Sequence, residues 1–512
     1  MIGRRLIALV AVLFGAAALM TPSFIAGHPS VFPDTSAYHL IGQWFAEQAG
    51  LRLDHGFGVI RHHDLAYFFT MAGARSPYYG ELFFLVTALG SAWAMAALQA
   101  LAASGLTALT LRVTQRGFRL RQFALAIGVL TLASTLPFFV NFLMPDVFLG
   151  LGAMAAILLL AYFDRLGRWE RGGLVVLLTA ALTFHATNPP AILILIAVAA
   201  VALAAKALPA RPAKAGLALV VAALGASAVA AAAYPLAIRA LEHRELARPP
   251  FFTARILADG PGRAFLRDAC ANGSPYVLCR FKDRPLTDAN DILWAVTAKK
   301  GVFEPADYAT RLALIHEESR FVVDAFEAHP LATTWDLFVD GVHELAVVTV
   351  VDTLGYSDRT LVAHGPRFDP PFGPVRFCVR RPNYCYPTPL QVGWDVVLNL
   401  AMSLSAAYLV ARLLLSRMTV RAVFHRAPLS PRLAVAVTAV LMLLVANALL
   451  CGALSGVYPR YQTRIEWLAP LFAVLAWLEN ARLPAGLGEG ATELEEEPAP
   501  TPERATISQP SF

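Results

Sequence analysis

Charged residues are scarce in this chain. They make up 15% of its 512 residues, whereas hydrophobic residues make up 57%. A soluble domain carries about 25% charged residues. The apolar runs reach the length of about 20 residues that a membrane-spanning helix needs. Long segments of alternating hydrophobicity, which outer-membrane barrels require, are missing. The composition therefore predicts an all-α polytopic membrane protein.

The chain also lacks the motifs of several common chemistries. It has no phosphate-cradling GxxxxGK[ST] loop, no GxGxxG before a helix, no HExxH and no CxxC. Any energy for a reaction must then come from the substrate itself. The net charge of +6 does not indicate a nucleic-acid partner, because Lys and Arg are spread among the loops that flank the apolar segments. Membrane topology explains these cations better.

About ten apolar segments are long enough to be counted as transmembrane helices. They are 6–26, 82–111, 122–141, 146–163, 172–185, 189–205, 216–237, 391–412, 433–454 and 464–480. Segment 172–185 is short, and a His-Ala-Thr-Asn-Pro-Pro run interrupts the chain after it, so this part could dip into the membrane instead of crossing it. The first segment also has the Arg-Arg start of a signal peptide, although the residues after it offer a poor cleavage site.

Arginine and lysine gather on one side of these segments. The short loops 142–145 and 186–188 on the other side carry none. Cytoplasmic loops are enriched in these residues, so both termini are expected in the cytoplasm. The cations on that side are Arg4, Arg5, Arg112, Arg116, Arg119, Arg121, Arg165, Arg168, Arg171, Lys206, Arg211, Lys214, Arg412, Arg417, Arg421, Arg426 and Arg432.

The same pattern divides the chain into four parts. Residues 1–237 form a membrane domain with a first outer loop at 27–81. Residues 238–390 form a small extracytoplasmic insert of mixed composition, and residues 391–480 form C-terminal membrane helices. The tail 481–512 is rich in Glu, Pro and Ala and is expected to be a disordered cytoplasmic tail.

Four of the five cysteines fall in the insert, on the side where disulfides persist. The simplest pairing joins Cys270 to Cys279 and Cys378 to Cys385, and the two other pairings stay open. Cys451 lies within a predicted span and is expected to be a plain core residue.

Two Pro-Asp pairs stand where an apolar segment meets water, Pro33-Asp34 and Pro145-Asp146. By the topology above, both carboxylates lie on the outer face. Charged groups at that depth are costly and are usually functional. Two acids at one membrane surface therefore suggest a catalytic site. The alternative is that each acid only caps the helix that follows it.

The helix expected after Asp34 has a one-sided apolar pattern. Its apolar positions are Ala37, Leu40, Ile41, Trp44 and Phe45. Helical spacing of this kind predicts an amphipathic helix that lies in the outer interface, with its aromatic residues at headgroup level.

Arginines stand on the outer side against the topological bias. Arg460 and Arg464 lie in the short outer loop before the last span, and Arg75 precedes the second span. Guanidinium groups bind phosphate oxygens in a bidentate manner, so Arg460 and Arg464 are candidate phosphate ligands. The alternative is that Arg460 and Arg464 contact lipid headgroups or Glu466.

A metal site is the weakest of the candidates. His62, His63 and Asp64 follow one another in the first outer loop and could contribute to a divalent site. Their spacing matches no fixed motif, and loop histidines usually face water. The residues thus suggest no cofactor other than a divalent metal.

These features resemble the GT-C superfamily of integral-membrane glycosyltransferases, which use polyprenyl-phosphate-linked sugars. The shared features are many spans, an acid near the start of the first outer loop, a second acid in the next outer loop and a larger outer insert. The resemblance implies that Asp34 is the catalytic residue, that Asp146 assists it, and that Arg75 and Arg460 hold the lipid phosphate. It also implies a bacterial-type inner membrane, with membrane lipids and a polyprenyl-phosphate sugar as partners.

The chain departs from parts of that pattern. It has neither the DxD-type acid pair of some members nor the late WWxD-like signature of oligosaccharyltransferases. The resemblance therefore implies no particular metal and disfavours protein N-glycosylation. Two other classes fit the composition: a transporter or lipid flippase, and a non-catalytic assembly protein whose insert binds a partner. A transporter would need polar residues deep in several spans, where the clearest are only Gln99, Asn399 and Asn447.

Overall fold

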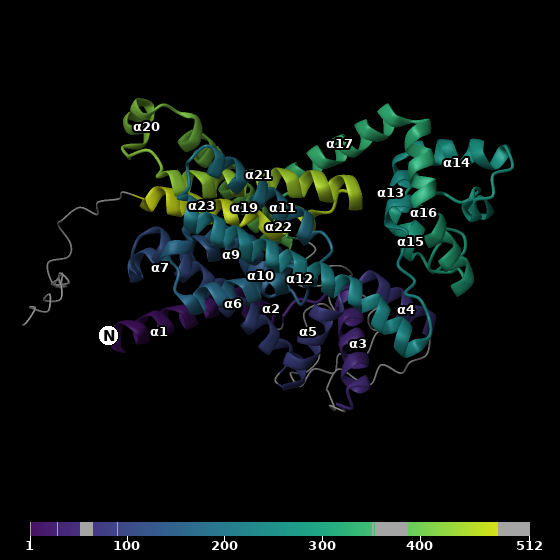
Figure 1. Cartoon of the computed structure of the whole chain (residues 1–512), viewed down its shortest axis with the longest axis horizontal. Coiled ribbons are helices and arrows are strands. Elements are labelled where there is room, and N and C mark those ends of the chain that lie inside the picture. Colours follow the sequence, from purple (N-terminus) through teal and green to yellow (C-terminus); the bar gives the residue numbers. More distant parts are fainter. Residues whose placement is uncertain are drawn as a thin grey trace, which may run out of the picture.

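The protein is helical throughout the residues described by the computed structural model, which are 2–27, 29–51, 65–89, 91–350, 353 and 388–479. Within these ranges the only β-type pairing is an isolated parallel bridge between Ser30 and Phe142. Figure 1 shows a body of packed helices and, at one end of it, a second group formed by α13 to α16.

Five helices of the body are long and apolar enough to cross a membrane. They are α6 (Ala92–Thr114), α9 (Val147–Tyr162) with the turn η1 (Phe163–Arg165), α12 (Ala210–Glu242), α19 (Thr388–Leu414) and α21 (Pro431–Ser455). Shorter apolar helices are α1 (Ile2–Leu19), α7 (Leu120–Leu132) and α11 (Asn188–Ala204). The all-α character is confirmed for the described residues, and five of their helices could cross a membrane by length and composition. The number of about ten spans stays a prediction.

Several predicted spans are divided into two helices. Segment 82–111 belongs to α5 (Pro77–Leu89) and α6, and α6 begins where the Ser91 hydroxyl accepts a hydrogen bond from the Trp93 N–H. The other divided segments form α1 with α2 (Thr21–Ala26), α7 with α8 (Leu136–Val140), and α22 (Pro459–Glu466) with α23 (Leu468–Leu478). Segment 172–185 forms one helix, α10 (Arg168–Phe184). Proline at the first turn of α2, α8 and α22 marks where these helices start.

Helix α9 lies at the centre of the body. Each of its residues is buried, and it packs against α6, α10, α11, α12 and α21. The approach to Trp467 is close: a Cβ on Gly150 would lie 2.6 Å from the ring of Trp467. Both Asp146 and the end of α22 are thereby fixed to the most buried element of the fold.

The segment predicted as the first outer loop contains α3 (Pro33–Gln48) and α4 (Leu65–Ala74). The predicted helix after Asp34 is thus present, but its environment differs from the expectation. Leu40, Ile41 and Trp44 are buried in a cluster with residues of α4 and α12, and α3 packs along α5. The apolar face meets protein because the loop folds back over α5, so these side chains do not lie among headgroups.

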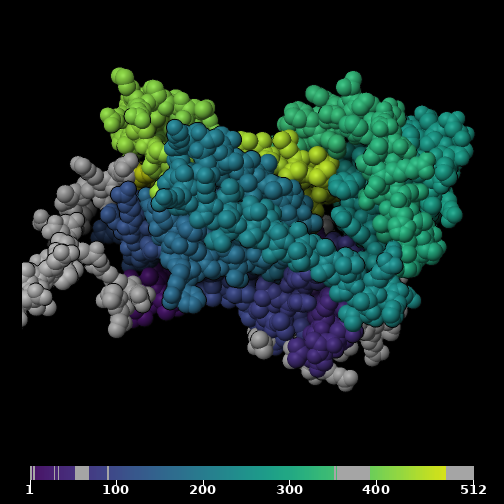
Figure 2. All heavy atoms as spheres, viewed as in Figure 1, coloured from purple at the N-terminus to yellow at the C-terminus, as the bar shows by residue number. Residues whose placement is uncertain are grey.

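Residues 251–346 form a further group of helices. They are α13 (Phe251–Asp259), α14 (Pro261–Ala271), η2 (Val277–Phe281), α15 (Ala289–Trp294), α16 (Tyr308–Ala328) and α17 (Pro330–Ala346). Leu257, Phe303 and Phe321 belong to a separate apolar core in this group. Figure 2 shows it as a teal and green lobe beside the blue body. Helix α17 joins the lobe to the body by packing on α21, and α20 (Arg417–Phe424) lies between α19 and α21.

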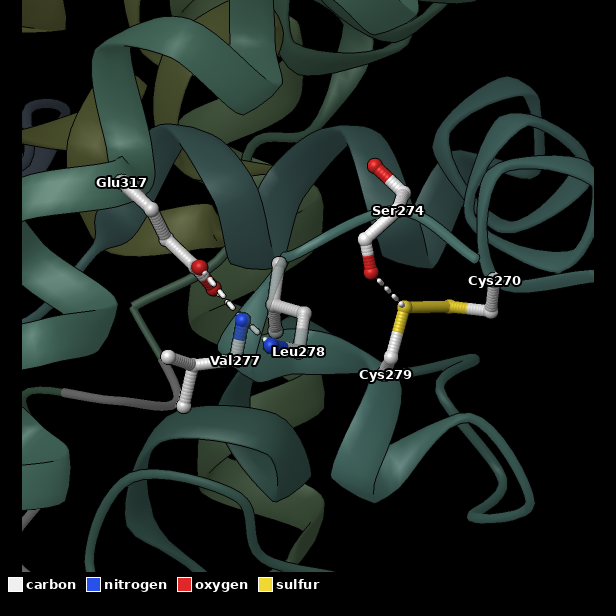
Figure 3. Close-up of a disulfide and its surroundings, with 6 residues drawn as sticks. All are labelled: Cys270, Ser274, Val277, Leu278, Cys279 and Glu317. Carbon is white, nitrogen blue, oxygen red and sulfur yellow. Dashed lines mark hydrogen bonds between the residues drawn. A yellow bond between two sulfur atoms is a disulfide. The ribbon is translucent and has the colours of Figure 1, made fainter. Parts of the chain in front are cut away.

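The Cys270–Cys279 disulfide joins α14 to η2 (Figure 3). Glu317 of α16 supports the same turn, because its carboxylate accepts hydrogen bonds from the N–H groups of Val277 and Leu278 at 2.6 and 2.9 Å. The first predicted bridge is present. Cys378 and Cys385 lie outside the described residues. Cys451 is buried in α21 as expected, but it contacts a site residue described below.

Candidate functional site

The two Pro-Asp loops are joined to each other by backbone hydrogen bonds. Ser30 donates to the carbonyl of Asn141 at 2.8 Å, and Leu143 donates to the carbonyl of Ser30 at 2.9 Å. The Thr35 hydroxyl also donates to the carbonyl of Leu143 at 3.1 Å. Segments more than a hundred residues apart are thereby held in one register, which brings the loop of Asp34 beside that of Asp146.

Two buried amides fix this junction to the helices. Asn141 donates to the carbonyls of Leu19 and Pro137, at 2.9 and 2.6 Å, and its own side-chain oxygen accepts from Ser23. Gln99, in the middle of α6, donates to the carbonyls of Val140 and Phe142. The polar residue that stood out within this predicted span therefore supports the outer loop.

Neither acid caps its helix through its side chain. The N-cap of α3 is Phe32, and the Thr35 hydroxyl accepts a hydrogen bond from the Phe32 N–H at 3.0 Å. Asp34 lies in the first turn of α3. Asp146 is at the N-cap position of α9 but makes no side-chain capping hydrogen bond. The capping alternative is thus not what these carboxylates do in the structure.

Asp34 lies between two arginines. Arg75 Nη2 donates to Asp34 Oδ1 at 2.5 Å, and Arg460 Nη2 lies 3.7 Å from Asp34 Oδ2. The Asp34 side chain is 16% exposed, so solvent screens these interactions only in part. Arg75 precedes α5, whereas Arg460 starts α22 near the end of the chain.

Opposing effects act on the pKa of Asp34. Burial raises the pKa of this carboxyl, but the attraction of Arg75 and Arg460 and the hydrogen bonds from both lower it more. The pKa of Asp34 therefore lies below its usual 3.8, and the group is ionised at neutral pH.

Asp146 and Arg464 form the second half of the site. Arg464 Nη1 lies 3.9 Å from Asp146 Oδ1, and the two side chains are 0% and 2% exposed, respectively. Arg464 Nη2 is fixed by Thr187 and Asn447, each at 3.0 Å, and by Cys451 Sγ at 3.4 Å. Cys451 is therefore a neighbour of a charged site residue and not a plain core residue.

Some polar atoms at this site have no partner in the described part of the chain. Asp146 Oδ1, Arg460 Nη1 and Arg464 Nη1 are buried and make no hydrogen bond there. Buried polar atoms usually have partners, and exceptions call for an explanation. A bound polar ligand would satisfy them.

Aromatic rings lie beside the guanidinium groups of Arg460 and Arg75. The guanidinium carbon of Arg460 lies 4.3 Å from the ring centre of Phe32 and 5.0 Å from that of Tyr461. The guanidinium carbon of Arg75 lies 5.5 Å from the ring centre of Trp294, on α15 of the second lobe. These faces restrict the guanidinium groups and attract their charge.

All five site residues expected from the sequence are thus brought together from separate parts of the chain. Three guanidinium groups and two carboxylates give one excess positive charge. Such a site can bind an anion through the arginines and place a carboxylate beside it. The sequence did not place Trp294 at the site, and it marked Asn447 only as a polar residue within a predicted span. Tyr38 lies four residues after Asp34 on α3, a spacing that places both residues on the same face of the helix. Its ring packs edge-on against that of the buried Tyr79, with the ring centres 5.0 Å apart.

The candidate metal ligands of the first loop cannot be placed at this site. His62, His63 and Asp64 lie outside the described residues. Within the ranges that the structure describes, no group of three or more His, Cys, Asp or Glu side chains is placed to hold a metal ion.

Comparison of the chain with family models, curated proteins and solved structures finds no match. The function is therefore argued from the geometry of the site.

Proposed function

We propose that the protein is a membrane glycosyltransferase that moves a sugar from a polyprenyl-phosphate donor to an envelope acceptor at the outer face of a bacterial inner membrane. The observation that carries this proposal is the convergence of Asp34 and Asp146 with Arg75, Arg460 and Arg464 at the ends of apolar helices. A lipid phosphate would enter such a place at headgroup depth, where its tail can stay in the bilayer.

The arginines supply the anion-binding part of the reaction. Arg75 and Arg460 both face Asp34, and a phosphate that enters would compete with Asp34 for them. Their charge would stabilise the negative charge that develops on the departing polyprenyl phosphate. The excess positive charge of the site favours binding of the donor over an empty, ion-paired state.

Binding of the donor would also change Asp34. In the structure, the two guanidinium groups keep this carboxylate ionised, and a carboxylate with a low pKa is a weak base. When the donor phosphate draws the arginines away, the basicity of Asp34 rises. Asp34 then accepts the proton of the acceptor hydroxyl while that oxygen bonds to the anomeric carbon. The bond from this carbon to the phosphate oxygen breaks, and its electron pair leaves with the phosphate.

Asp146 and Arg464 would act on the sugar side. Asp146 is fixed at the start of the buried helix α9, so it can orient an acceptor or steady the positive charge at the anomeric carbon. Its Oδ1 lies near Arg464 but makes no hydrogen bond within the described residues, so it is available for a hydroxyl donor. The positive charge of Arg464 offsets the negative charge of Asp146 in this half of the site.

Transfer in membrane vesicles tests the proposal. Vesicles that contain the protein and polyprenyl-phosphate sugars are compared with vesicles that contain Asp34→Asn, and the transferred sugar is measured. General-base removal is expected to lower the rate by about 10²–10⁴-fold. The matched control is Asp268→Asn, an exposed acid on α14. Full transfer by Asp34→Asn would contradict the proposal. Movement of the sugar across the membrane without a new glycosidic bond would contradict it as well.

A further inference from the structure

A second polar site lies at the opposite end of the membrane body from Asp34. It is a cavity of about 650 Å³ lined by Arg112, Arg116, Arg165, Arg432 and Asp164, with Phe118 among its apolar neighbours. Asp146 and Asp164 stand at the two ends of α9 and η1. A helical rise of about 1.5 Å per residue separates them by roughly 27 Å, close to the thickness of a bilayer core.

Part of the positive charge around this cavity is neutralised. Arg432 makes a bidentate ion pair with Asp164, at 2.7 and 2.9 Å. Arg112 pairs with Glu170 at 2.6 Å. Each of these arginines therefore has a carboxylate of its own.

Two arginines of the cavity remain uncompensated. Among the described residues, neither Arg116 nor Arg165 has a carboxylate oxygen within 4.0 Å. Arg165 is fixed in place, because its Nη1 donates to the carbonyl of Val113 at 2.9 Å and its guanidinium carbon lies 5.4 Å from the ring centre of Tyr162. Arg116 is exposed at the end of α6. Arginines beside a span are ordinarily solvated separately, whereas Arg116 and Arg165 line the same cavity as two further arginines.

We propose that this cavity binds a phosphate-bearing anionic group, with Arg116 and Arg165 as its principal ligands. Guanidinium groups match phosphate oxygens in geometry and charge. The cavity lies where two spans, α6 and α9, end, and basic pockets between helices at such a level bind anionic lipid headgroups. Phe118 offers an apolar wall to the glycerol end of a lipid. The site shares no residue with the Asp34 site, so it does not depend on the proposed function.

Lipid retention tests this inference with the full-length purified chain. The protein in detergent receives phosphatidylglycerol or phosphatidylcholine, and native mass spectrometry measures the affinity of each. Each arginine near an anionic lipid contributes about 1 kcal/mol, so Arg116→Gln and Arg165→Gln should each weaken phosphatidylglycerol about fivefold. The control is Arg119→Gln, which alters an exposed arginine of the same loop outside the cavity. Arg116→Gln alone keeps the test valid if Arg165→Gln fails to fold.

A second arm separates a lipid from a soluble ligand. Thermal unfolding is measured with inorganic phosphate and with chloride at equal ionic strength. Selective binding of phosphatidylglycerol that both substitutions weaken supports a lipid headgroup. Stabilisation by phosphate that both substitutions remove, without selectivity among lipids, supports a soluble phosphate compound. Equal binding of both lipids together with no effect of phosphate overturns the inference, as does an equal loss in Arg119→Gln.

Discussion

The Asp34 carboxylate is held between Arg75 and Arg460, and this links the stability of the protein to pH. Its pKa is lower in the folded protein than the usual 3.8. A depressed pKa gives a stabilisation that is fully present above the unfolded pKa, about 3.9 for Asp. It is lost as the pH falls through the folded value.

We expect wild-type protein to lose this contribution progressively below about pH 4. Asp34→Asn lacks it at every pH. Thermal unfolding in detergent, measured from neutral pH to strong acid, should show the largest difference between the two proteins at neutral pH and a shrinking difference in acid. A difference that is independent of pH would contradict the ion pair, and Asp268→Asn serves as the control.

Asn447 holds Arg464 in place, and this role can also be tested by thermal unfolding. Its Oδ1 accepts from Arg464, and its Nδ2 donates to the carbonyl of Tyr461 and to Gln462. Asn447→Ala leaves buried partners unsatisfied, at a cost of about 1–3 kcal/mol. We expect a lower midpoint of thermal unfolding and slower sugar transfer.

The matched control for Asn447 is Asn399→Ala. Asn399 also lies within a long apolar helix, but it is exposed, and within the described ranges it donates to the carbonyl groups of Val348 and Asp395. It should change both measurements less. Equal effects of the two substitutions would show that the contacts of Arg464 are not special.

The acids and arginines of the site could be predicted from the sequence because charge is rare and costly at span ends. The residues that hold these side chains in place could not. Asn447 resembles any other amide in an apolar run, and nothing local places Trp294, a residue of the insert, over Arg75. The roles of the acids stay proposals even though the side chains are neighbours.

Among the elements, α3 and α5 depend on a close glycine contact. A Cβ on Gly42 would lie 2.1 Å from the backbone oxygen of Gly80, so any larger residue at position 42 must push α3 away from α5. Asp34 and Arg75 stand at the starts of these two helices. Gly42→Val should cost about 1–3 kcal/mol by overpacking and should also reduce transfer, because the ion pair is displaced.

Gly128→Ala is the control for this contact. Gly128 lies within α7, and a Cβ there meets no atom within 4 Å. Alanine in a helix is favoured over glycine by about 1 kcal/mol, so this variant should be neutral or slightly more stable. If Gly42→Val also unfolds like the wild type, the close contact does not position the site.

The division of several predicted spans into two helices is also a property of individual elements. Hydropathy reports how apolar a segment is, but it is nearly blind to a break such as Ser91 or Pro137, where a helix starts anew. The one-sided pattern of α3 identified a helix correctly, but its apolar face gave no sign of whether protein or lipid covers it. Packing partners are long-range information.

At the scale of the whole molecule, the second lobe reaches the site of the membrane body. Arg255 of α13 pairs with Asp340 of α17 and donates to the carbonyl of Ala453 in α21. Asn290 of α15 donates to the Tyr458 hydroxyl at 2.6 Å, directly before α22. The lobe is therefore anchored to α21 and to Tyr458 before α22, and the position of Trp294 over Arg75 is set by the assembled fold.

This arrangement predicts that the lobe contributes to recognition of the donor phosphate through Arg75. Trp294→Ala removes the ring beside Arg75, and a cation–π contact of this kind contributes about 0.5–2 kcal/mol. We expect a higher KM for the sugar donor, because Arg75 is a proposed ligand of the donor phosphate, and a modest loss of thermal stability, because Trp294 is partly buried against the lobe's core. Trp335→Ala, which removes a 64% exposed ring on α17, is the control and should leave KM unchanged. A loss of kcat at unchanged KM would instead assign Trp294 to the support of Arg75 in the chemical step.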